Sequence, residues 1–310
     1  MTSGVFDLPK ARHAHFVRSA DGTSINVEEY GPEPGTAPTV VLIHGWTCST
    51  RFWAPLVHEL AGEYRVVAYD QRGHGRSGTP RRDGYGTDAL ADDLTAVLES
   101  VLASDEKAVL VGHSMGGMTA MAAGDRPAIQ SRTAALLLAS TGSGRLLAET
   151  LVLPPRVRAK RVRDAFHRFL LISAAPLGPQ SAVTRAALKH GILGPDSSPE
   201  LVAATARIVH ACGRRQRAAW GRVLAGLNLD AGVAALRVPT AVLVGTDDKL
   251  TPPVHARGLA ARLSHFAGLT ELPGLGHMTP LEAPAAVAGV VRTLITDHLR
   301  PQAQVKEEKA

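Results

Sequence analysis

Short, continuous runs of apolar and β-branched residues recur along this chain, and they constrain its fold more than any other feature. Five of them lie at 38–43, 65–70, 107–113, 133–140 and 239–245. Such runs are typical of strands that are covered on both faces, as in parallel sheets. Segments between them have helical periodicity, as at 52–61 and 87–102. This alternation predicts an α/β fold, with a mostly parallel sheet between two layers of helices.

Further elements are expected toward both ends of the chain. Asp21 and Gly22 form a dipeptide typical of a hairpin turn between strands at 15–20 and 24–30. A last strand is expected at 269–272, followed by a helix at 280–299.

The alternation breaks between 142 and 235, where no strand pattern occurs. Helical patterns are present instead at 154–172, 179–189, 199–212 and 214–227. A segment of this length is too long for a loop in a compact domain, so we expect an inserted helical unit. The predicted organisation is a core made of 1–141 and 236–300, the insertion at 142–235, and a polar, disordered tail at 301–310.

Composition and charge argue against several classes of function. Aromatic residues make up only 4% of the chain and do not alternate with basic ones, which argues against nucleic-acid binding. No apolar run approaches the ~20 residues of a membrane helix, and the N-terminal segment lacks the features of a signal peptide, so a cytoplasmic location is expected. Cys48 and Cys212 show no metal-ligand spacing and are expected to be buried, unpaired thiols.

The sequence Gly112-His113-Ser114-Met115-Gly116 lies where an expected buried strand meets an Ala- and Gly-rich helix. A serine at such a tight turn takes a strained backbone conformation, and side chains two residues before and after it would collide. The strain exposes the hydroxyl beside the N-terminus of the helix. Ser114 is therefore the candidate nucleophile.

A serine hydroxyl needs a base to accept its proton. His277 lies in a loop after the last expected strand, and the carboxyl ends of parallel strands meet at one edge of the sheet. Asp247 and Asp248 follow the strand at 239–245, and adjacent side chains in an extended loop point in different directions. We expect Asp248, rather than Asp247, to orient His277.

The third requirement is a pair of donors for the negative oxygen of the intermediate. Gly45 permits close approach of the chain after the strand at 38–43, so the backbone N–H groups of Trp46 and Met115 are the expected pair. His44 is expected to bond loop backbone without transferring protons, and the Trp46 ring to line the acyl pocket. The segment 69–78 lacks the spacings of phosphate-binding loops and is interpreted as a rigid supporting turn.

Together these segments resemble the α/β-hydrolase superfamily. The matching pieces are HGW at 44–46, YDQRGHGRSG at 69–78, GHSMGG at 112–117, GTDDKLTP at 245–252 and GHMTPLEAP at 276–284. The resemblance implies an eight-stranded, mostly parallel sheet with a helical cap at 142–235. It also implies Ser114 as nucleophile, His277 as base, Asp248 as its partner, and the Trp46 and Met115 amides as the oxyanion hole. Relatives that act on haloalkanes or epoxides have an aspartate where this chain has Ser114, which disfavours those reactions.

The leading expectation is a serine hydrolase that cleaves a carboxylic ester, thioester or lactone through an acyl-enzyme, with no cofactor and no metal. The alternatives are a hydrolase of carbon–carbon bonds, a cofactor-free perhydrolase of the haloperoxidase type, and a ligand receptor with slow turnover. The expected partner is a small acyl substrate. Length of the acyl group, stereochemistry and oligomeric state do not follow from the sequence.

The positive charge is concentrated in the insertion. Residues 142–235 hold 12 Arg and 2 Lys against 5 acidic residues, and the net charge of the chain is +6. The segment 154–172 is basic, and Val157, Val162, Phe166, Phe169 and Leu170 could form an apolar side. Attraction of an anionic substrate or membrane surface is one hypothesis, and an arginine-rich solvated surface is the other.

Overall fold

The computed structural model describes residues 4–81, 83–153 and 160–299. Its centre is an eight-stranded sheet in the order β1-β2-β4-β3-β5-β6-β7-β8. The strands are β1 (His13–Arg18), β2 (Ser24–Tyr30), β3 (Thr39–Ile43), β4 (Arg65–Tyr69), β5 (Ala108–His113), β6 (Thr133–Ala139), β7 (Thr240–Gly245) and β8 (Phe266–Leu272). The pairs β1–β2 and β2–β4 are antiparallel, and the other pairs are parallel. The predicted α/β fold is therefore confirmed.

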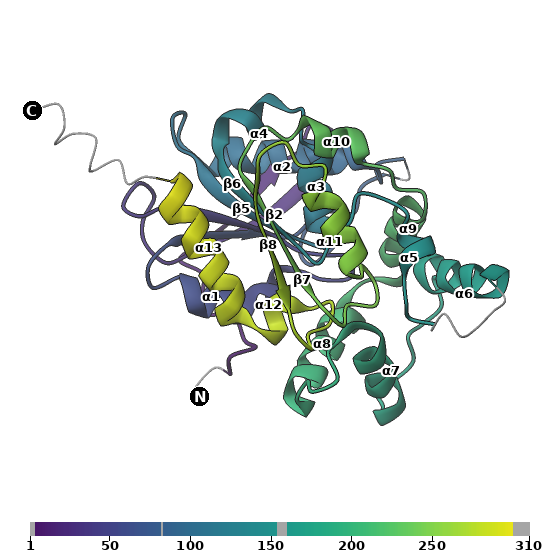
Figure 1. Cartoon of the computed structure of the whole chain (residues 1–310). Helices are drawn as coiled ribbons and strands as arrows, with labels where there is room; N and C mark the ends of the chain where they lie inside the picture. Colours follow the sequence, from purple (N-terminus) through teal and green to yellow (C-terminus); the bar gives the residue numbers. More distant parts are fainter. Residues whose placement is uncertain (1–3, 82, 154–159, 300–310) are drawn as a thin grey trace, which may run out of the picture.

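Helices cover both faces of the sheet (Figure 1). One face packs against α2 (Thr87–Val101), α3 (Met115–Ala122), α4 (Pro127–Arg132), α10 (Asp230–Ala235) and α11 (Pro253–Ala260). The other packs against η1 (Thr50–Trp53), α1 (Ala54–Leu60), α12 (Thr279–Glu282) and α13 (Pro284–His298). Because β3, β4, β5 and β6 contact helices on both sides, all of their residues are buried, as the apolar runs predict.

The predicted helix at 280–299 is wrong as one element. It breaks at Ala283, whose backbone (φ −143°, ψ 63°) separates α12 from α13. Pro284 explains the break, because its ring excludes the helical conformation from the preceding residue. The short helices α4 and α10 carry no strong periodic pattern and were not expected.

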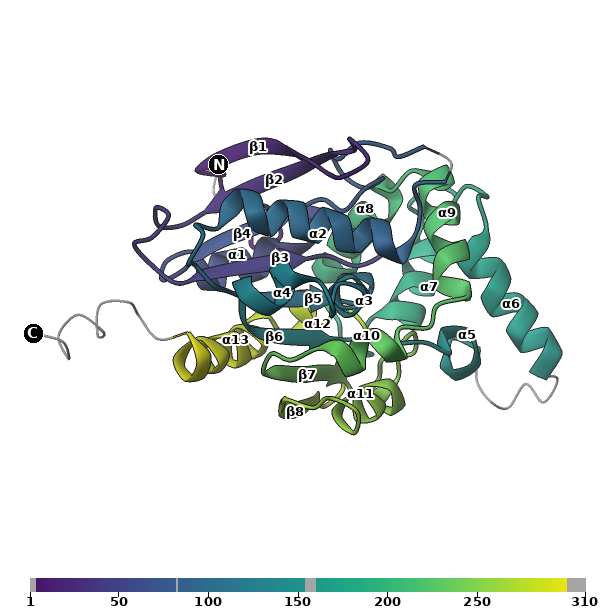
Figure 2. The same cartoon turned by 90° about the horizontal axis from the view of Figure 1, so that it is seen from above.

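The helical insertion, residues 142–235, lies between β6 and β7 in the chain. Its helices are α5 (Leu146–Glu149), α6 (Lys160–Ile172), α7 (Ala182–Ile192), α8 (Pro199–Ala211), α9 (Arg214–Ala225) and α10. Figures 1 and 2 show α5 to α9 together at one end of the sheet. The expected disordered tail at 301–310 and the first six residues of the helix predicted at 154–172 lie outside the described residues.

On α6, the described side chains of the expected apolar side are exposed. Val162 and Phe169 are each 60% exposed, and Phe166 and Leu170 are also exposed. Among the described helices, none combines the length and hydrophobicity needed to cross a bilayer. Of the two thiols, Cys48 is buried as expected, but Cys212 is half-buried; both are free.

Candidate active site

Ser114 occupies a strained turn between β5 and α3. Its backbone angles are φ 52° and ψ −118°, a conformation that residues other than glycine rarely adopt. A Cβ on Gly112 would lie 2.7 Å from the backbone of Gly117, and one on Gly116 would overlap the carbonyl oxygen of Ile43. The two glycines therefore let the chain turn sharply beside β3, as the sequence predicts.

Asp248 meets His277 at the carboxyl ends of β7 and β8. Nδ1 of His277 lies 2.9 Å from Oδ2 of Asp248, and both side chains are almost fully buried. The other carboxylate oxygen accepts the backbone N–H groups of Leu250 and Thr251, each at 2.9 Å. Asp247 points away into solvent. The carboxylate therefore fixes the imidazole so that Nδ1 carries the proton and Nε2 is free to accept one.

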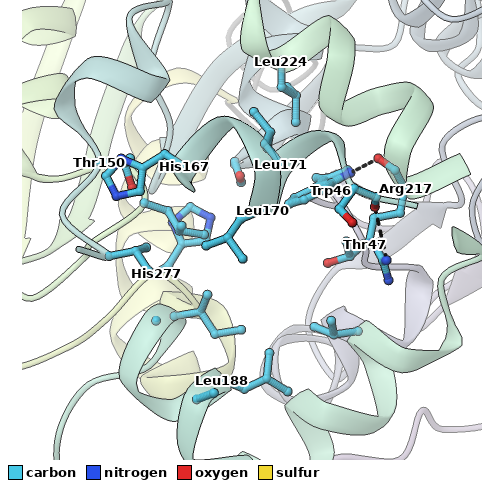
Figure 3. Close-up of a pocket in the computed structure, with 18 of the residues that line it drawn as sticks. Trp46, Thr47, Thr150, His167, Leu170, Leu171, Leu188, Arg217, Leu224 and His277 are labelled. Atoms are coloured by element: carbon cyan, nitrogen blue, oxygen red, sulfur yellow. Dashed lines mark hydrogen bonds between the residues drawn. The ribbon is translucent and has the colours of Figure 1, made fainter. Parts of the chain in front are cut away.

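Ser114 and His277 line the same cavity, which has a volume of about 720 Å³. Among the described residues, neither the Ser114 hydroxyl nor Nε2 of His277 has a hydrogen-bond partner. Most of the other lining residues are apolar and come from the helical insertion, such as Leu170, Leu188 and Leu224 (Figure 3). An unpaired hydroxyl and an unpaired ring nitrogen thus face one apolar space.

The segment after β3 lies directly against the turn at Ser114. A Cβ on Gly45 would be 3.0 Å from the Cβ of Ser114, so only glycine permits this approach. The backbone N–H groups of Trp46 and Met115 donate to no described residue. Met115 is the first residue of α3, where no acceptor exists within the helix. Both predicted donors are therefore free.

Two histidines near the site are held neutral by burial. Burial lowers the pKa of His44 to about 4. Its Nε2 accepts the backbone N–H of Gln71 at 3.0 Å, which is the loop contact expected for it. Burial, together with nearby His277, also holds the pKa of His113 well below its ordinary value. His113 donates from Nε2 to the His277 carbonyl at 2.8 Å and so supports that loop.

The segment 69–78 supports neighbouring elements, as the sequence indicates. The Asp70 carboxylate accepts the backbone N–H groups of Thr50 and Arg76 at 2.8 and 2.9 Å. Arg72 is 1% exposed and makes a bidentate contact with Asp93 of α2 at 2.6 and 2.7 Å. These bonds fix the loop between the sheet and α2.

Two tryptophans fasten α9 to the core. Trp46 donates its indole N–H to the backbone carbonyl of Arg217 at 3.0 Å (Figure 3). Trp220 donates in the same way to the carbonyl of Arg72, also at 3.0 Å. The Trp46 ring thus lines the cavity, as expected, and also joins the segment after β3 to the insertion.

Glu282 connects the loop of His277 to the insertion. Its carboxylate accepts the backbone N–H groups of Gly194, Gly276 and Met278 at 2.6, 3.0 and 3.0 Å. The backbone N–H of His277 also donates to the carbonyl of Ile192, the last residue of α7, at 2.9 Å. The bonds to Glu282 and the bond to Ile192 together hold the loop that carries the imidazole in place.

Sequence reasoning missed three polar residues at this site. Thr251 donates its hydroxyl to Asp248 at 2.9 Å and lies in the motif that contains the acid. Glu282 lies in the segment GHMTPLEAP, so its position beside His277 was a usable signal. Arg217 lines the cavity although it is one of several arginines in its segment, and nothing in the sequence distinguishes it from the others.

One group of described side chains has the composition of a metal site, but it lies on the edge strand β1 and its neighbour β2. The ligand atoms of His13, His15 and Glu29 lie within 4.8 Å of one another. Oε2 of Glu29 is already bound by Arg65 at 2.8 Å and by Arg12 at 3.0 Å. These residues are not among those that line the cavity.

Comparison with known proteins places the chain in a family. The model of the alpha/beta hydrolase family matches residues 40–290. The chain belongs to the alpha/beta hydrolase family. The crystal structure of the esterase RhEst1 from Rhodococcus sp. ECU1013 superimposes with a TM-score of 0.73 at 24% identity, over 91% of this chain and 98% of that one. This similarity shows that the two share the fold.

The relatives of this chain have several different names. The "Bifunctional esterase/perhydrolase DCH" of Acinetobacter calcoaceticus is 43% identical over 33% of this chain, and the match spans only 36% of that protein. The "Non-heme chloroperoxidase" of Burkholderia pyrrocinia is 28% identical over 84% of this chain and 92% of that protein. Membership of this family supports a hydrolase activity. The substrate class has to be argued from the geometry of the site.

Proposed function

We propose that this protein is a serine hydrolase that cleaves a carboxylic ester, thioester or lactone through an acyl-enzyme at Ser114. The observation that carries the proposal is the 2.9 Å hydrogen bond between Asp248 and His277, with Nε2 of His277 left free in the cavity that Ser114 lines. A positioned base and an unpaired hydroxyl in the same cavity are what nucleophilic catalysis by serine requires.

In this mechanism Nε2 of His277 takes the proton of Ser114 as Oγ attacks the substrate carbonyl. The backbone N–H groups of Trp46 and Met115 donate to the oxygen that becomes negative, and each such donor stabilises the transition state by about 3 kcal/mol. His277 then gives its proton to the leaving oxygen or sulfur atom. Water, deprotonated by His277, attacks the acyl-enzyme and releases the acid.

We also propose that the helical insertion, residues 142–235, acts as a cap over this site. Leucines of α6, α7 and α9 line the cavity together with Ser114 and His277. In this position the cap excludes water and supplies the surface that binds the acyl group.

A fluorophosphonate probe and p-nitrophenyl esters of short acids test the proposal. We expect stoichiometric labelling, many turnovers per molecule, and loss of both in Ser114→Ala. Ser131→Ala on α4, whose hydroxyl bonds only the Pro127 carbonyl, is the matched control and should behave as wild type. Labelling that persists in Ser114→Ala would remove Ser114 from the mechanism, and labelling without turnover would favour a receptor.

Perhydrolysis is a second candidate, favoured by the names of the two relatives described above. Hydrogen peroxide would replace water in attacking the acyl-enzyme, so that the acyl group leaves as a peracid and the Ser114 hydroxyl is regenerated. Peracid formation from acetate and hydrogen peroxide is measured in the presence of bromide, which the peracid oxidises to hypobromous acid, and this acid brominates monochlorodimedone. Activity that is lost in Ser114→Ala would assign it to the same site.

A further inference from the structure

Arg217, on the first turns of α9, is a buried cation in the wall of the cavity. It is only 4% exposed, yet it lines the cavity together with Ser114 and His277. Figure 3 shows it beside Thr47, across the open space from His277. A guanidinium cannot lose its proton in a protein, so this charge is permanent.

No acidic side chain among the described residues compensates this charge. Its Nη2 donates to the backbone carbonyls of Ser173, at 3.3 Å, and Ala175. Nε and Nη1 make no hydrogen bond to any described residue. They are not sealed off, in contrast to the enclosed and unpaired nitrogens of His113 and His167. Donors are thus left open on a side chain that faces the cavity.

The rest of the cavity wall makes this charge stand out. Among the described residues that line it there is no Asp, Glu or Lys, and the polar groups are histidines and neutral hydroxyls. Burial of an unpaired charge in apolar surroundings is costly unless a partner of opposite charge is present. An anion that enters the cavity would supply that partner and would form charge-assisted hydrogen bonds with the guanidinium.

The position of Arg217 is fixed before any substrate binds. Its backbone carbonyl accepts the indole N–H of Trp46, and Trp220, three residues later, is fully buried and bonded to Arg72. These bonds fix the backbone of α9, and the bonds from Nη2 to the Ser173 and Ala175 carbonyls hold the guanidinium, so it loses little freedom on binding a planar carboxylate.

We propose that Arg217 binds a carboxylate of the substrate, so that the preferred substrate is an ester, thioester or lactone with an apolar body and a second, anionic end. This inference rests on the proposed hydrolase function and names the substrate class of that site. The apolar lining holds the body of the molecule, and Arg217 sets the position of its anionic end relative to Ser114.

The test compares mono-p-nitrophenyl esters of dicarboxylic acids, from succinate to sebacate, with p-nitrophenyl esters of monocarboxylic acids of equal length. We expect the anionic ester to be preferred in kcat/KM at one or more lengths. In Arg217→Gln the ratio of kcat/KM for the anionic ester to kcat/KM for the neutral ester of equal length should fall by about 10- to 100-fold. Hydrolysis of the neutral esters also shows that the variant has folded.

Two controls separate Arg217 from the exposed arginines of the insertion. Arg214→Gln alters an exposed arginine of the same helix and should leave the preference intact. The preference should also persist at about 1 M salt, because a buried pair is screened much less than exposed charges. A preference that salt abolishes, or that Arg217→Gln retains, or that wild type lacks at every length, would overturn the proposal.

A binding measurement keeps this inference distinct from the hydrolase proposal. Octanoate should raise the melting temperature of wild type more than octanol does at neutral pH, and the difference should vanish in Arg217→Gln. If no ester is turned over but this difference is found, the hydrolase proposal fails while the anion site stands. If esters are hydrolysed and octanoate stabilises both proteins equally, the carboxylate binds elsewhere and the anion site is rejected.

Discussion

The indole N–H of Trp220 bonds the backbone carbonyl of Arg72 at 3.0 Å, which joins α9 of the insertion to the loop after β4. The guanidinium of Arg72 in turn donates to the carboxylate of Asp93 on α2. The wall of the cavity that carries Arg217 is therefore connected through two bonds to a helix on the face of the sheet.

Trp220→Phe should lower the free energy of unfolding by about 1–3 kcal/mol, because the buried Arg72 carbonyl loses one of its two donors, the other being Nδ1 of His74 at 3.2 Å. Urea denaturation measures the change. Tyr85→Phe is the control, since Tyr85 packs edge-on against Trp220 at 5.3 Å and its hydroxyl bonds no described residue. Equal stability of the two variants would show that the indole bond contributes little.

Asp248→Asn should lower kcat for ester hydrolysis by about 10⁴-fold, because an amide in this position favours the wrong tautomer of His277. Steady-state kinetics on a p-nitrophenyl ester measures the loss. Asp247→Asn, at the exposed neighbouring position, should leave kcat unchanged. A large loss in Asp247→Asn, with Asp248→Asn active, would reassign the acid.

Glu282→Gln should lower kcat by about 10- to 100-fold, because one of the two carboxylate oxygens becomes an NH2 group that faces either the N–H of Met278 or those of Gly194 and Gly276, and so displaces the loop of His277. Glu282 is a positioning residue, so the KM for a neutral ester should change much less than kcat. Glu271→Gln, a half-buried position on β8 paired with Arg257 and outside the cavity, is the control. Unchanged kcat in Glu282→Gln would mean that the other bonds suffice to hold the loop.

His74 should contribute to a loss of stability as the pH is lowered. Burial, with a smaller effect of His44, lowers the pKa of His74 from 6.5 to about 3. Below pH 6.5 the unfolded chain binds a proton there that the folded chain does not, so stability is lost as pH falls toward 3. The folded state is thus favoured at higher pH by this group.

His74→Phe isolates this contribution from those of other buried groups. The stability of the variant relative to wild type should rise by about 1.4 kcal/mol for each pH unit below 6.5. Urea denaturation of both proteins at pH 7, 6 and 5 measures the difference. A difference that does not change with pH would show that His74 is protonated in the folded state.

The sequence was most informative where a chemically reactive residue directly follows a parallel strand. Ser114, Asp248 and His277 each follow a strand of the parallel part of the sheet, and the fold brings such positions to one edge. The hairpin at Asp21-Gly22 and the buried strands also follow from local patterns. Local pattern is enough in these places because it sets which face of each element is buried.

Inside the insertion the same reasoning fails for Arg217. The segment RRQR contains three arginines, of which Arg214 and Arg215 are exposed while Arg217 is buried. Only the anchoring of α9 by Trp46 and Trp220 decides which of them faces the cavity, and both anchors bond residues far away in the chain. The apolar residues of α6 are a related case, since Val162 is 60% exposed whereas Phe169 lines the cavity, and the local pattern does not distinguish the two positions.

The bonds from Ile192 and Gly194 to the loop of His277 bear on how such enzymes can be re-engineered. The backbone N–H of His277 donates to the Ile192 carbonyl, and the Glu282 carboxylate accepts the backbone N–H of Gly194. The insertion is thus no interchangeable module. A chimera that carries the corresponding segment of a relative would need to reproduce those two backbone positions. Otherwise the imidazole of His277 would shift relative to Ser114.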